Sequence, residues 1–201
     1  MNKKTNILIV NDDGIEAYGI AKLAAMAANF GDVWVVAPEG QCSGMSQRLT
    51  IFSELNVQER EFPATVRAAY SVSGTPADCV KVALKSLLPD YVFSGINAGF
   101  NAGYDIAYSG TVGAAMEAVL HDIPAIAFST QHDGSYEITD KYLMPIAEEL
   151  MQKSNAGEIW NVNFPGGQAC DFKGIIRGTE AAQSFFFEND YQKLEREGKI
   201  V

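Results

Sequence analysis

The chain has few of the residues that build the common metal and nucleophile sites. Its 201 residues include three scattered cysteines without a CxxC pair, and only two histidines. These counts argue against a zinc site or a disulfide framework, so reduced thiols are expected. The Gly-x-Ser-x-Gly signature of serine hydrolases is absent. The first expected strand is followed by neither a Gly-x-x-x-x-Gly-Lys phosphate loop nor a Gly-x-Gly-x-x-Gly fingerprint.

Positive charge and long apolar runs are also scarce. The formal net charge is -10, which argues against a nucleic-acid polymer or an anionic membrane as partner. No apolar run is long enough for a membrane span, and the run that follows Lys3 and Lys4 is too short for a signal peptide. We therefore expect a cytoplasmic globular protein. A phosphorylated small molecule fits this charge if metal ions and helix N-termini supply local positive potential.

Strand-like and helix-like segments alternate along the chain. This order predicts a Rossmann-like α/β fold, with a mainly parallel sheet flanked by helices. We expect a core over residues 1–165 and a short C-terminal extension over 166–201 that serves as an oligomerisation arm. Strands are expected at 7–10, 33–37, 91–94, 124–128 and 159–162, with an antiparallel excursion or edge within 49–73.

Helix signals separate these strands. A helix is expected that includes residues 20–27, with Gly31 as its stop, and others that include residues 112–119 and run over about 138–152. Another should run from Thr75 to about residue 88. Thr75 is its N-cap, Pro76 takes the first helical position, and Asp78 completes a capping box.

Two adjacent carboxylates, Asp12 and Asp13, directly follow the first strand. Ligands of open α/β sheets bind at the carboxyl ends of the strands. Neighbouring like charges repel unless a cation neutralises them, and oxygen ligands of this kind suit Mg²⁺, Mn²⁺ or Ca²⁺. The alternative is a solvated turn, because Asp-Asp-Gly is also ordinary turn chemistry.

Two further loops follow expected strands and carry oxygen ligands. One offers the hydroxyl of Ser43, and the other offers the amides of Asn97 and Asn101 among small residues. Together with the carboxylates they predict a hard-cation site. The free N–H groups at the start of the next helix would hold a phosphate, at Ser109, Gly110 and Thr111. Each feature alone is common in loops, and their combination at successive strand ends is what predicts a site.

These motifs closely resemble the SurE family (survival protein E), which are 5'/3'-nucleotidases that also cleave short polyphosphate. The resemblance spans residues 6–165 and is carried by the stretches 11–20, 36–46, 74–80, 94–103 and 108–112. It implies a Rossmann-like core, Mg²⁺ or Mn²⁺ as cofactor, a cytoplasmic location and a homodimer or homotetramer. By motif, the implied metal ligands are Asp12, Asp13, Ser43 and Asn97. The implied phosphate contacts are Asn97, Asn101, Ser109, Gly110 and Thr111.

The chain departs from the family after residue 165. The family's later Gly-Thr-Asp and Gly-Tyr-Val-Ser stretches are not found, and the chain ends at Val201. The apolar tail over 185–191 is expected to pack on other structure, with a second subunit as one candidate.

The resulting prediction is a metal-dependent phosphomonoesterase that hydrolyses nucleoside 5'-monophosphates, and by resemblance also 3'-monophosphates and short polyphosphate. Asp12 and Asp13 are the candidate catalytic residues, and Asp12 is favoured for orienting or deprotonating the attacking water. One alternative is a metal-dependent nucleotide-binding protein that has lost catalysis through its short C-terminal part. Another is a receiver-like signalling module, but that would need a third aspartate where the chain has Phe93-Ser94-Gly95.

Overall fold

The computed structural model describes residues 4–132, 135–186, 195–196 and 199–200. The strands in these ranges are β1 (Thr5–Val10), β2 (Gly31–Pro38), β3 (Val57–Glu59), β4 (Ala68–Val72), β5 (Tyr91–Ala98), β6 (Ala125–Thr130), β7 (Ile159–Phe164), β8 (Glu195–Arg196) and β9 (Lys199–Ile200). The α-helices are α1 (Tyr18–Ala27), α2 (Pro76–Ala83), α3 (Gly110–Val119) and α4 (Glu137–Lys153). Two short 3₁₀ helices are η1 (Gly103–Tyr108) and η2 (Ala169–Asp171).

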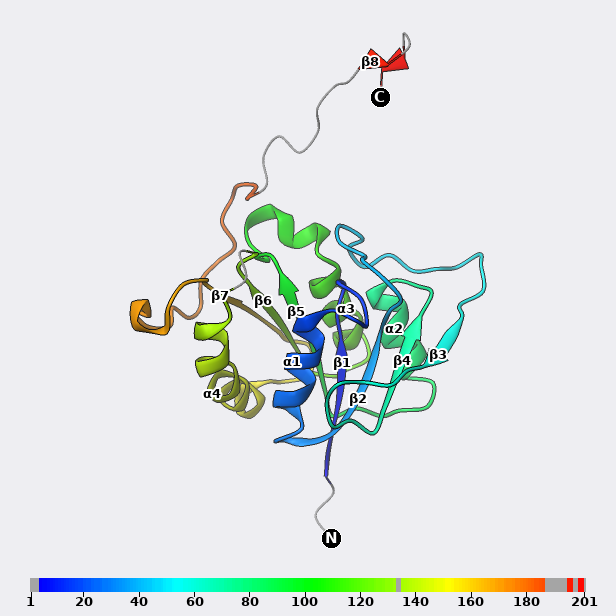
Figure 1. Ribbon diagram of the computed structural model, residues 1–201, viewed down its shortest axis with the longest axis horizontal. Coiled ribbons are helices and arrows are strands. Elements are labelled where there is room, and N and C mark those ends of the chain that lie inside the picture. The colour runs from blue at the N-terminus through cyan, green and yellow to red at the C-terminus, as the bar shows by residue number, and fades with distance from the viewer. Residues whose placement is uncertain (1–3, 133–134, 187–194, 197–198, 201) are drawn as a thin grey trace.

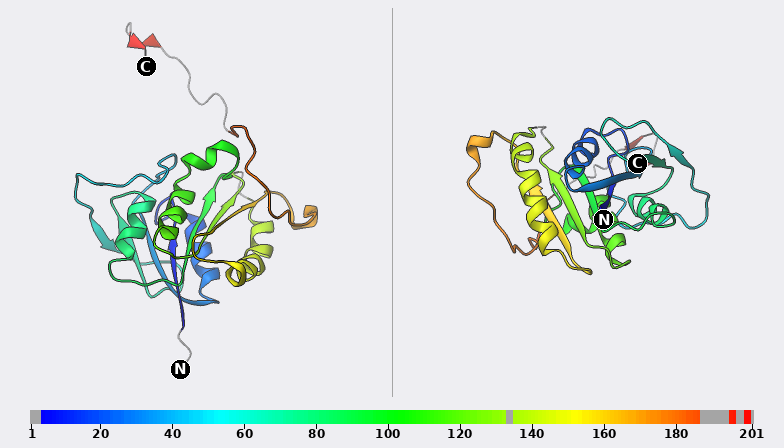
Figure 2. Two further views of the ribbon diagram at one scale, coloured as in Figure 1. Left: turned by 180° about the vertical axis from the view of Figure 1, so that it is seen from behind. Right: turned by 90° about the horizontal axis from the view of Figure 1, so that it is seen from below.

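The first seven strands form one sheet in the order β3-β4-β2-β1-β5-β6-β7. Every neighbouring pair in this sheet is parallel except β3 with β4. Helices α1 and α4 cover one face, and α2 and α3 cover the other (Figures 1 and 2). The expected mainly parallel α/β fold is confirmed. The short pair β8 and β9 is antiparallel and separate from this sheet.

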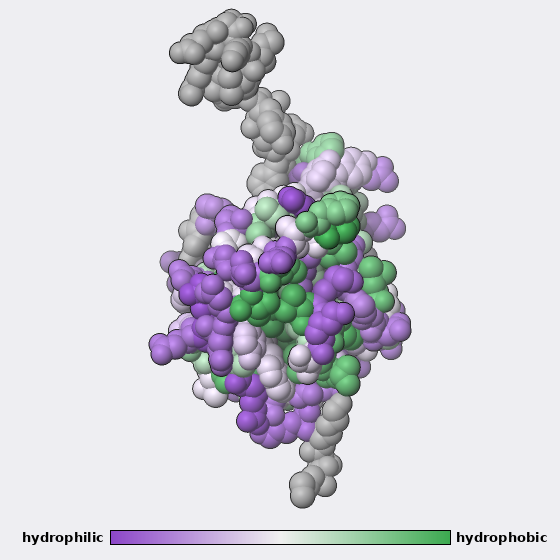
Figure 3. All heavy atoms as spheres, turned by 90° about the vertical axis from the view of Figure 1, so that its right-hand side faces the viewer, coloured by the Kyte–Doolittle hydropathy of each residue, from purple (hydrophilic) through white to green (hydrophobic). Residues whose placement is uncertain are grey.

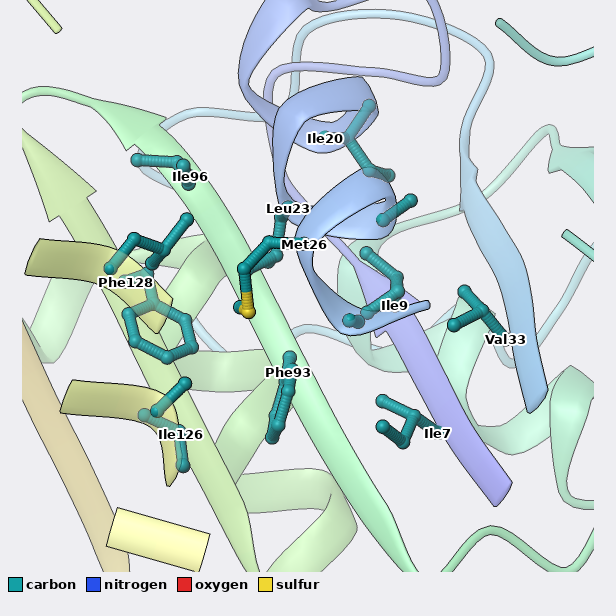
Figure 4. Close-up of a cluster of buried hydrophobic side chains, with 14 of the residues drawn as sticks. Ile7, Ile9, Ile20, Leu23, Met26, Val33, Phe93, Ile96, Ile126 and Phe128 are labelled. Atoms are coloured by element: carbon teal, nitrogen blue, oxygen red, sulfur yellow. The ribbon is translucent and has the colours of Figure 1, made fainter. Parts of the chain in front are cut away.

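The sheet has a buried centre because helices pack on both of its faces. The four apolar residues that end β1 are all 0% exposed, as a central strand requires. Ile7 and Ile9 face α1 and α4, where the rings of Phe93 and Phe128 meet edge to face at 5.7 Å (Figure 4). Leu8 faces α2 and α3 on the other side. This packing fixes β1 at the middle of the molecule.

The strand order reverses beside β1. From β1 the chain moves outward to β2 and β4, and then it returns to β5 on the opposite side of β1. Such a reversal opens a crevice at the carboxyl ends of the two central strands. Asp12 and Asp13 follow the end of β1, and Asn97 lies near the end of β5. The topology therefore places these candidate ligands beside one crevice.

The end of the first helix differs from the expectation. α1 ends at Ala27, so Gly31 is not its stop but the first residue of β2. A Cβ at Gly31 would lie 2.1 Å from the carbonyl oxygen of Thr5, so glycine is needed here for the close pairing of β2 with β1. Similarly, α2 ends at Ala83 rather than near residue 88.

The segment 49–73 is partly as expected. β3 is an antiparallel edge strand, whereas β4 runs parallel to β2. The loop before β3 leaves Ile51 73% and Phe52 100% exposed. Figure 3 looks onto the side of the molecule that carries β3 and β4, where apolar side chains are bordered by hydrophilic ones. This side therefore presents both apolar and polar groups to solvent.

The expected capping box of α2 is present. The hydroxyl oxygen of Thr75 accepts from the Asp78 N–H at 3.2 Å, and the Asp78 carboxylate accepts from the Thr75 N–H at 3.0 Å. Asp78 also accepts from the backbone N–H of Thr50 at 3.0 Å and from its hydroxyl at 2.7 Å. Burial alone would raise the pKa of Asp78, but the hydrogen bonds from Thr75 and Thr50 outweigh it and lower that pKa. One carboxylate thus joins α2 to the loop before β3.

Asp78→Ala should lower the free energy of unfolding by about 2–4 kcal/mol, because it leaves donors of half-buried Thr50 and buried Thr75 unpaired. A lowered folded pKa means that Asp78 stabilises the fold fully above its ordinary pKa of 3.8. That contribution is lost as the pH falls through the lower folded pKa, so the difference between variant and parent should shrink in acid. Urea titrations measure both effects, with exposed Glu61→Ala as control. Equal stability of the two variants at neutral pH would contradict this account.

The described part of the C-terminal extension runs from β7 past α4 and returns to η1 (Figure 1). Phe172 stacks on Tyr142 of α4 with ring centroids 3.9 Å apart, and Arg177 pairs with Glu149 at 2.6 Å. Near η1, the Tyr104 N–H donates to the carbonyl of residue 184 at 2.9 Å. The rings of residues 185 and 186 contact those of Tyr104 and residue 100.

As expected, the apolar tail packs on other structure: residues 185 and 186 contact aromatic rings of the same chain. Residues 187–191 lie outside the described ranges, and assembly as a homodimer or homotetramer stays a prediction. Among the helices of the described ranges, none has both the length and the apolar character needed to cross a membrane.

Candidate functional site

Asp12 is a buried carboxylate at the end of β1. Asp12 is 2% exposed, and the Thr111 hydroxyl donates to the Asp12 Oδ1 at 2.5 Å. Burial raises the pKa of Asp12 to about 6; the Thr111 hydrogen bond opposes this rise, and the charge of Asp13 adds to it. An ionised Asp12 beside Asp13 therefore costs free energy unless positive charge is supplied nearby. This electrostatic demand suits a bound cation.

Asp13 is held by the end of β5 and by the loop after β2. Its Oδ2 accepts from the backbone N–H of Ala98 at 3.0 Å, and its Oδ1 accepts from the Gln41 amide at 2.8 Å. The carbonyl oxygen of the same Gln41 side chain accepts from the Ser43 hydroxyl at 3.1 Å. Gln41 therefore connects two of the predicted metal ligands. This role of Gln41 was not predicted, because a glutamine in a polar loop carries no sequence signal of it.

The start of α3 packs directly against Asp12. A Cβ at Gly110 would lie 2.8 Å from the Asp12 Cβ and 3.2 Å from the Cys42 carbonyl oxygen. The Cys42 N–H donates to the Asp12 carbonyl at 2.6 Å. Ser109 caps the helix by accepting from the Val112 N–H at 3.1 Å. Two segments distant in sequence, the loop after β2 and the start of α3, thus converge on Asp12.

Asn97 lies where β5 is irregular. The pairing of β5 with β6 shifts register between Ser94 and Asn97. Gly95 has φ +129°, and a Cβ there would lie 2.2 Å from the Phe128 carbonyl oxygen, so only glycine fits. The Asn97 amide nitrogen donates to the Gly99 carbonyl at 2.8 Å. Because the Asn97 amide nitrogen is used in this hydrogen bond, its Oδ1 is the atom suited to bind a cation.

Asn101 has a structural role in the loop that follows β5. It is 3% exposed, and its amide donates to the Ser129 hydroxyl at 2.6 Å. Its backbone carbonyl accepts from the amides of Asn161 at 2.9 Å and Asn163 at 3.0 Å, both on β7. These partners were not anticipated, because contacts between separate strands leave no local sequence pattern. Asn101 anchors the loop, and its predicted contact with phosphate stays a prediction.

The candidate metal ligands are all side-chain oxygen atoms. In the ranges that the structure describes, no three His, Cys, Asp or Glu side chains gather as a metal site. The candidate set instead combines two carboxylates with the hydroxyl of Ser43 and the amide oxygen of Asn97. Beside Asp12 in the chain, buried Asn11 has an Oδ1 without a hydrogen-bond partner among the described residues. Oxygen donors and this unpaired oxygen fit a hard cation better than zinc.

The fold and this site together define a class: Rossmann-like α/β proteins with an acidic, oxygen-rich site at the switch point of a mainly parallel sheet. Comparison with known families narrows the class. The family model described as Survival protein SurE matches residues 7–186. The chain belongs to the SurE family.

Individual relatives agree with this assignment. A protein named 5'-nucleotidase SurE from Clostridium botulinum (strain Kyoto / Type A2) is 40% identical over 204 residues, which cover 98% of this chain and 80% of that protein. A protein named 5'-nucleotidase SurE 1 from Chlamydia caviae is 43% identical over 183 residues, covering 84% of this chain and 64% of that protein. The crystal structure of the SurE protein from Aquifex aeolicus superposes with a TM-score of 0.74 at 37% identity, covering 85% of this chain and 70% of that one.

Proposed function

We propose that the chain is a metal-dependent 5'-nucleotidase, a phosphomonoesterase that releases phosphate from nucleoside 5'-monophosphates. The observation that carries the proposal is the buried Asp12 beside Asp13, with the first turn of α3 packed against it. Relatives named 5'-nucleotidase SurE, at 40% and 43% identity, support the activity. Extension to 3'-monophosphates and short polyphosphate belongs to the same proposal.

Asp12 and Asp13 would hold Mg²⁺ or Mn²⁺ together with Ser43 and Asn97. When bound, such an ion polarises phosphoryl oxygens and lowers the pKa of water. Gln41 would keep Asp13 and Ser43 in register through its two hydrogen bonds, of 2.8 Å and 3.1 Å. The Thr111 hydroxyl fixes the orientation of Asp12.

The remaining roles concern the phosphate and the attacking water. The Val112 N–H donates to the capping Ser109 hydroxyl, so the N–H groups of Gly110 and Thr111 are those that would stabilise negative charge on the phosphoryl oxygens. Gly110 allows this helix start to approach Asp12 closely. One of the two carboxylates, with Asp12 favoured, would orient the water and accept its proton.

Phosphate release by the purified chain tests this function. With adenosine 5'-monophosphate and Mn²⁺ or Mg²⁺ present, we expect turnover that falls at least 100-fold in excess chelator and returns when the metal is restored. The effect follows because the two carboxylates would otherwise repel the anionic substrate. Undiminished turnover in chelator would contradict metal dependence.

The same experiment separates the enzyme from a nucleotide-binding protein without catalysis. That alternative predicts metal-dependent binding of the nucleotide and no phosphate release. Assays with a 3'-monophosphate and with short polyphosphate then define the range of substrates.

A further inference from the structure

A cavity of about 330 Å³ lies beside the acidic site. Its walls come from residues 38–42 after β2, from the following loop as far as Thr50, and from 72–75 between β4 and α2. This volume is at the lower end of the range of small-molecule pockets in proteins, which begins near about 300 Å³. It is large enough to hold part of a ligand whose remainder lies elsewhere.

The cavity and the acidic site share two residues of one loop. Gln41 lines the cavity and also donates to Asp13 at 2.8 Å. Cys42 lines it as well, and its N–H donates to the Asp12 carbonyl at 2.6 Å. A phosphorylated molecule bound at the two carboxylates would therefore have this cavity within reach of its other end.

The charges on the cavity wall are balanced. Two ionisable side chains of opposite sign, Glu39 and Arg48, line it. A second phosphate would meet the Glu39 carboxylate as well as the Arg48 guanidinium, so the wall offers no net attraction to a dianion. An uncharged group that makes hydrogen bonds suits this balance better.

The other groups on the cavity wall favour a ligand that has hydrogen-bond donors and a flat apolar face. Thr50 donates its hydroxyl hydrogen to Asp78 at 2.7 Å, which leaves its oxygen as an acceptor toward a ligand. Met45 supplies apolar surface on the same wall. The guanidinium of Arg48 can stack on an aromatic ring. A nucleobase with its sugar combines N–H and O–H donors with a flat face.

We propose that this cavity binds the nucleoside part of the substrate whose phosphate is held at Asp12 and Asp13. The proposal rests on the proposed function and makes Arg48 and the 38–42 segment determinants of specificity. With this cavity, the protein would bind nucleotides more tightly than phosphomonoesters that lack a base.

Gly40 has room for a larger side chain beside the cavity. It lines the cavity, and a Cβ built on it would meet no other atom within 4 Å. Gly40→Leu should raise KM for adenosine 5'-monophosphate at least tenfold and change kcat less than threefold. The kcat/KM for glycerol phosphate, which has no base, should stay within twofold. Gly40→Ala should show a smaller rise, and Ala156→Leu, an exposed turn position, should show none.

Arg48→Ala gives a second, independent variant. It should raise KM for adenosine 5'-monophosphate about fivefold or more and leave glycerol phosphate unaffected, because the stacking and charge of the guanidinium are lost. A selective loss for the nucleotide in either variant supports the proposal. Failure of both variants to distinguish the two substrates would overturn it.

Calorimetric titration of adenosine 5'-monophosphate in the presence of Mn²⁺ separates this inference from the proposed function. If the parent protein releases no phosphate from any substrate, the proposed function fails and the titration alone decides the role of the cavity. Tenfold weaker binding by Gly40→Leu than by the parent then supports the cavity as the nucleoside site. Equal binding by both proteins overturns it.

Discussion

Asp12→Asn should abolish metal-dependent phosphate release while making the metal-free protein more stable. The asparagine can still accept the Thr111 hydrogen bond, which measures 2.5 Å in the parent. It removes one of two adjacent negative charges, and with it the ligand best placed to attract a cation. We expect turnover to fall by at least about 1,000-fold, within the range that one group at a catalytic metal site supplies.

The gain in stability has a separate physical cause. Burial and the charge of Asp13 both raise the pKa of Asp12, which shows that its ionised form is unfavourable without a cation. Removing that charge should increase the free energy of unfolding at neutral pH in chelator by about 1–3 kcal/mol. Denaturant titrations with chelator measure this, and Asp171→Asn makes the same chemical change at an exposed position. A variant that keeps its turnover, or that loses stability in chelator, would contradict the account.

Gly110→Ala should impair activity and stability together. The added Cβ would lie 2.8 Å from the Asp12 Cβ and 3.0 Å from its Oδ2, so the start of α3 must move away from β1. Because this helix start is proposed to face the phosphate, we expect kcat/KM to fall about 10- to 100-fold. Overpacking of this kind typically costs about 1–3 kcal/mol of unfolding free energy.

Steady-state kinetics and denaturant titrations check this prediction. Met116→Ala, on the same helix at a position that is 45% exposed, serves as the matched control. The proposed contact between α3 and the site would be wrong if Gly110→Ala behaved like that control.

The fold was largely predictable because its signals are local. Four apolar residues before Asp12 indicated a strand buried on both faces, and all four are fully buried in β1. The start of α2 was predictable from Thr75, Pro76 and Asp78, because helix capping depends on side chains within one helical turn. Helix ends were less predictable, because α2 stops at Ala83 without a glycine or proline to mark the position.

The candidate site was predictable to the extent that parallel strands end at one edge. Asp12 and Asp13, the loop of Ser43 and the end of β5 do meet there, connected by hydrogen bonds. Gln41 was missed because its bridging role depends on how one loop folds back on another. The hydrogen bond from the Asn101 amide to Ser129 was missed because only the packed structure reveals this partner, and the predicted contact of Asn101 with phosphate stays a prediction.

Diffraction from a crystal grown with Mn²⁺, recorded at the manganese absorption edge, tests the metal site most directly. The account predicts an anomalous peak among the side-chain oxygens of Asp12, Asp13, Ser43 and Asn97, at distances typical of coordination. These four side chains pointing apart, with no peak between them, would contradict it.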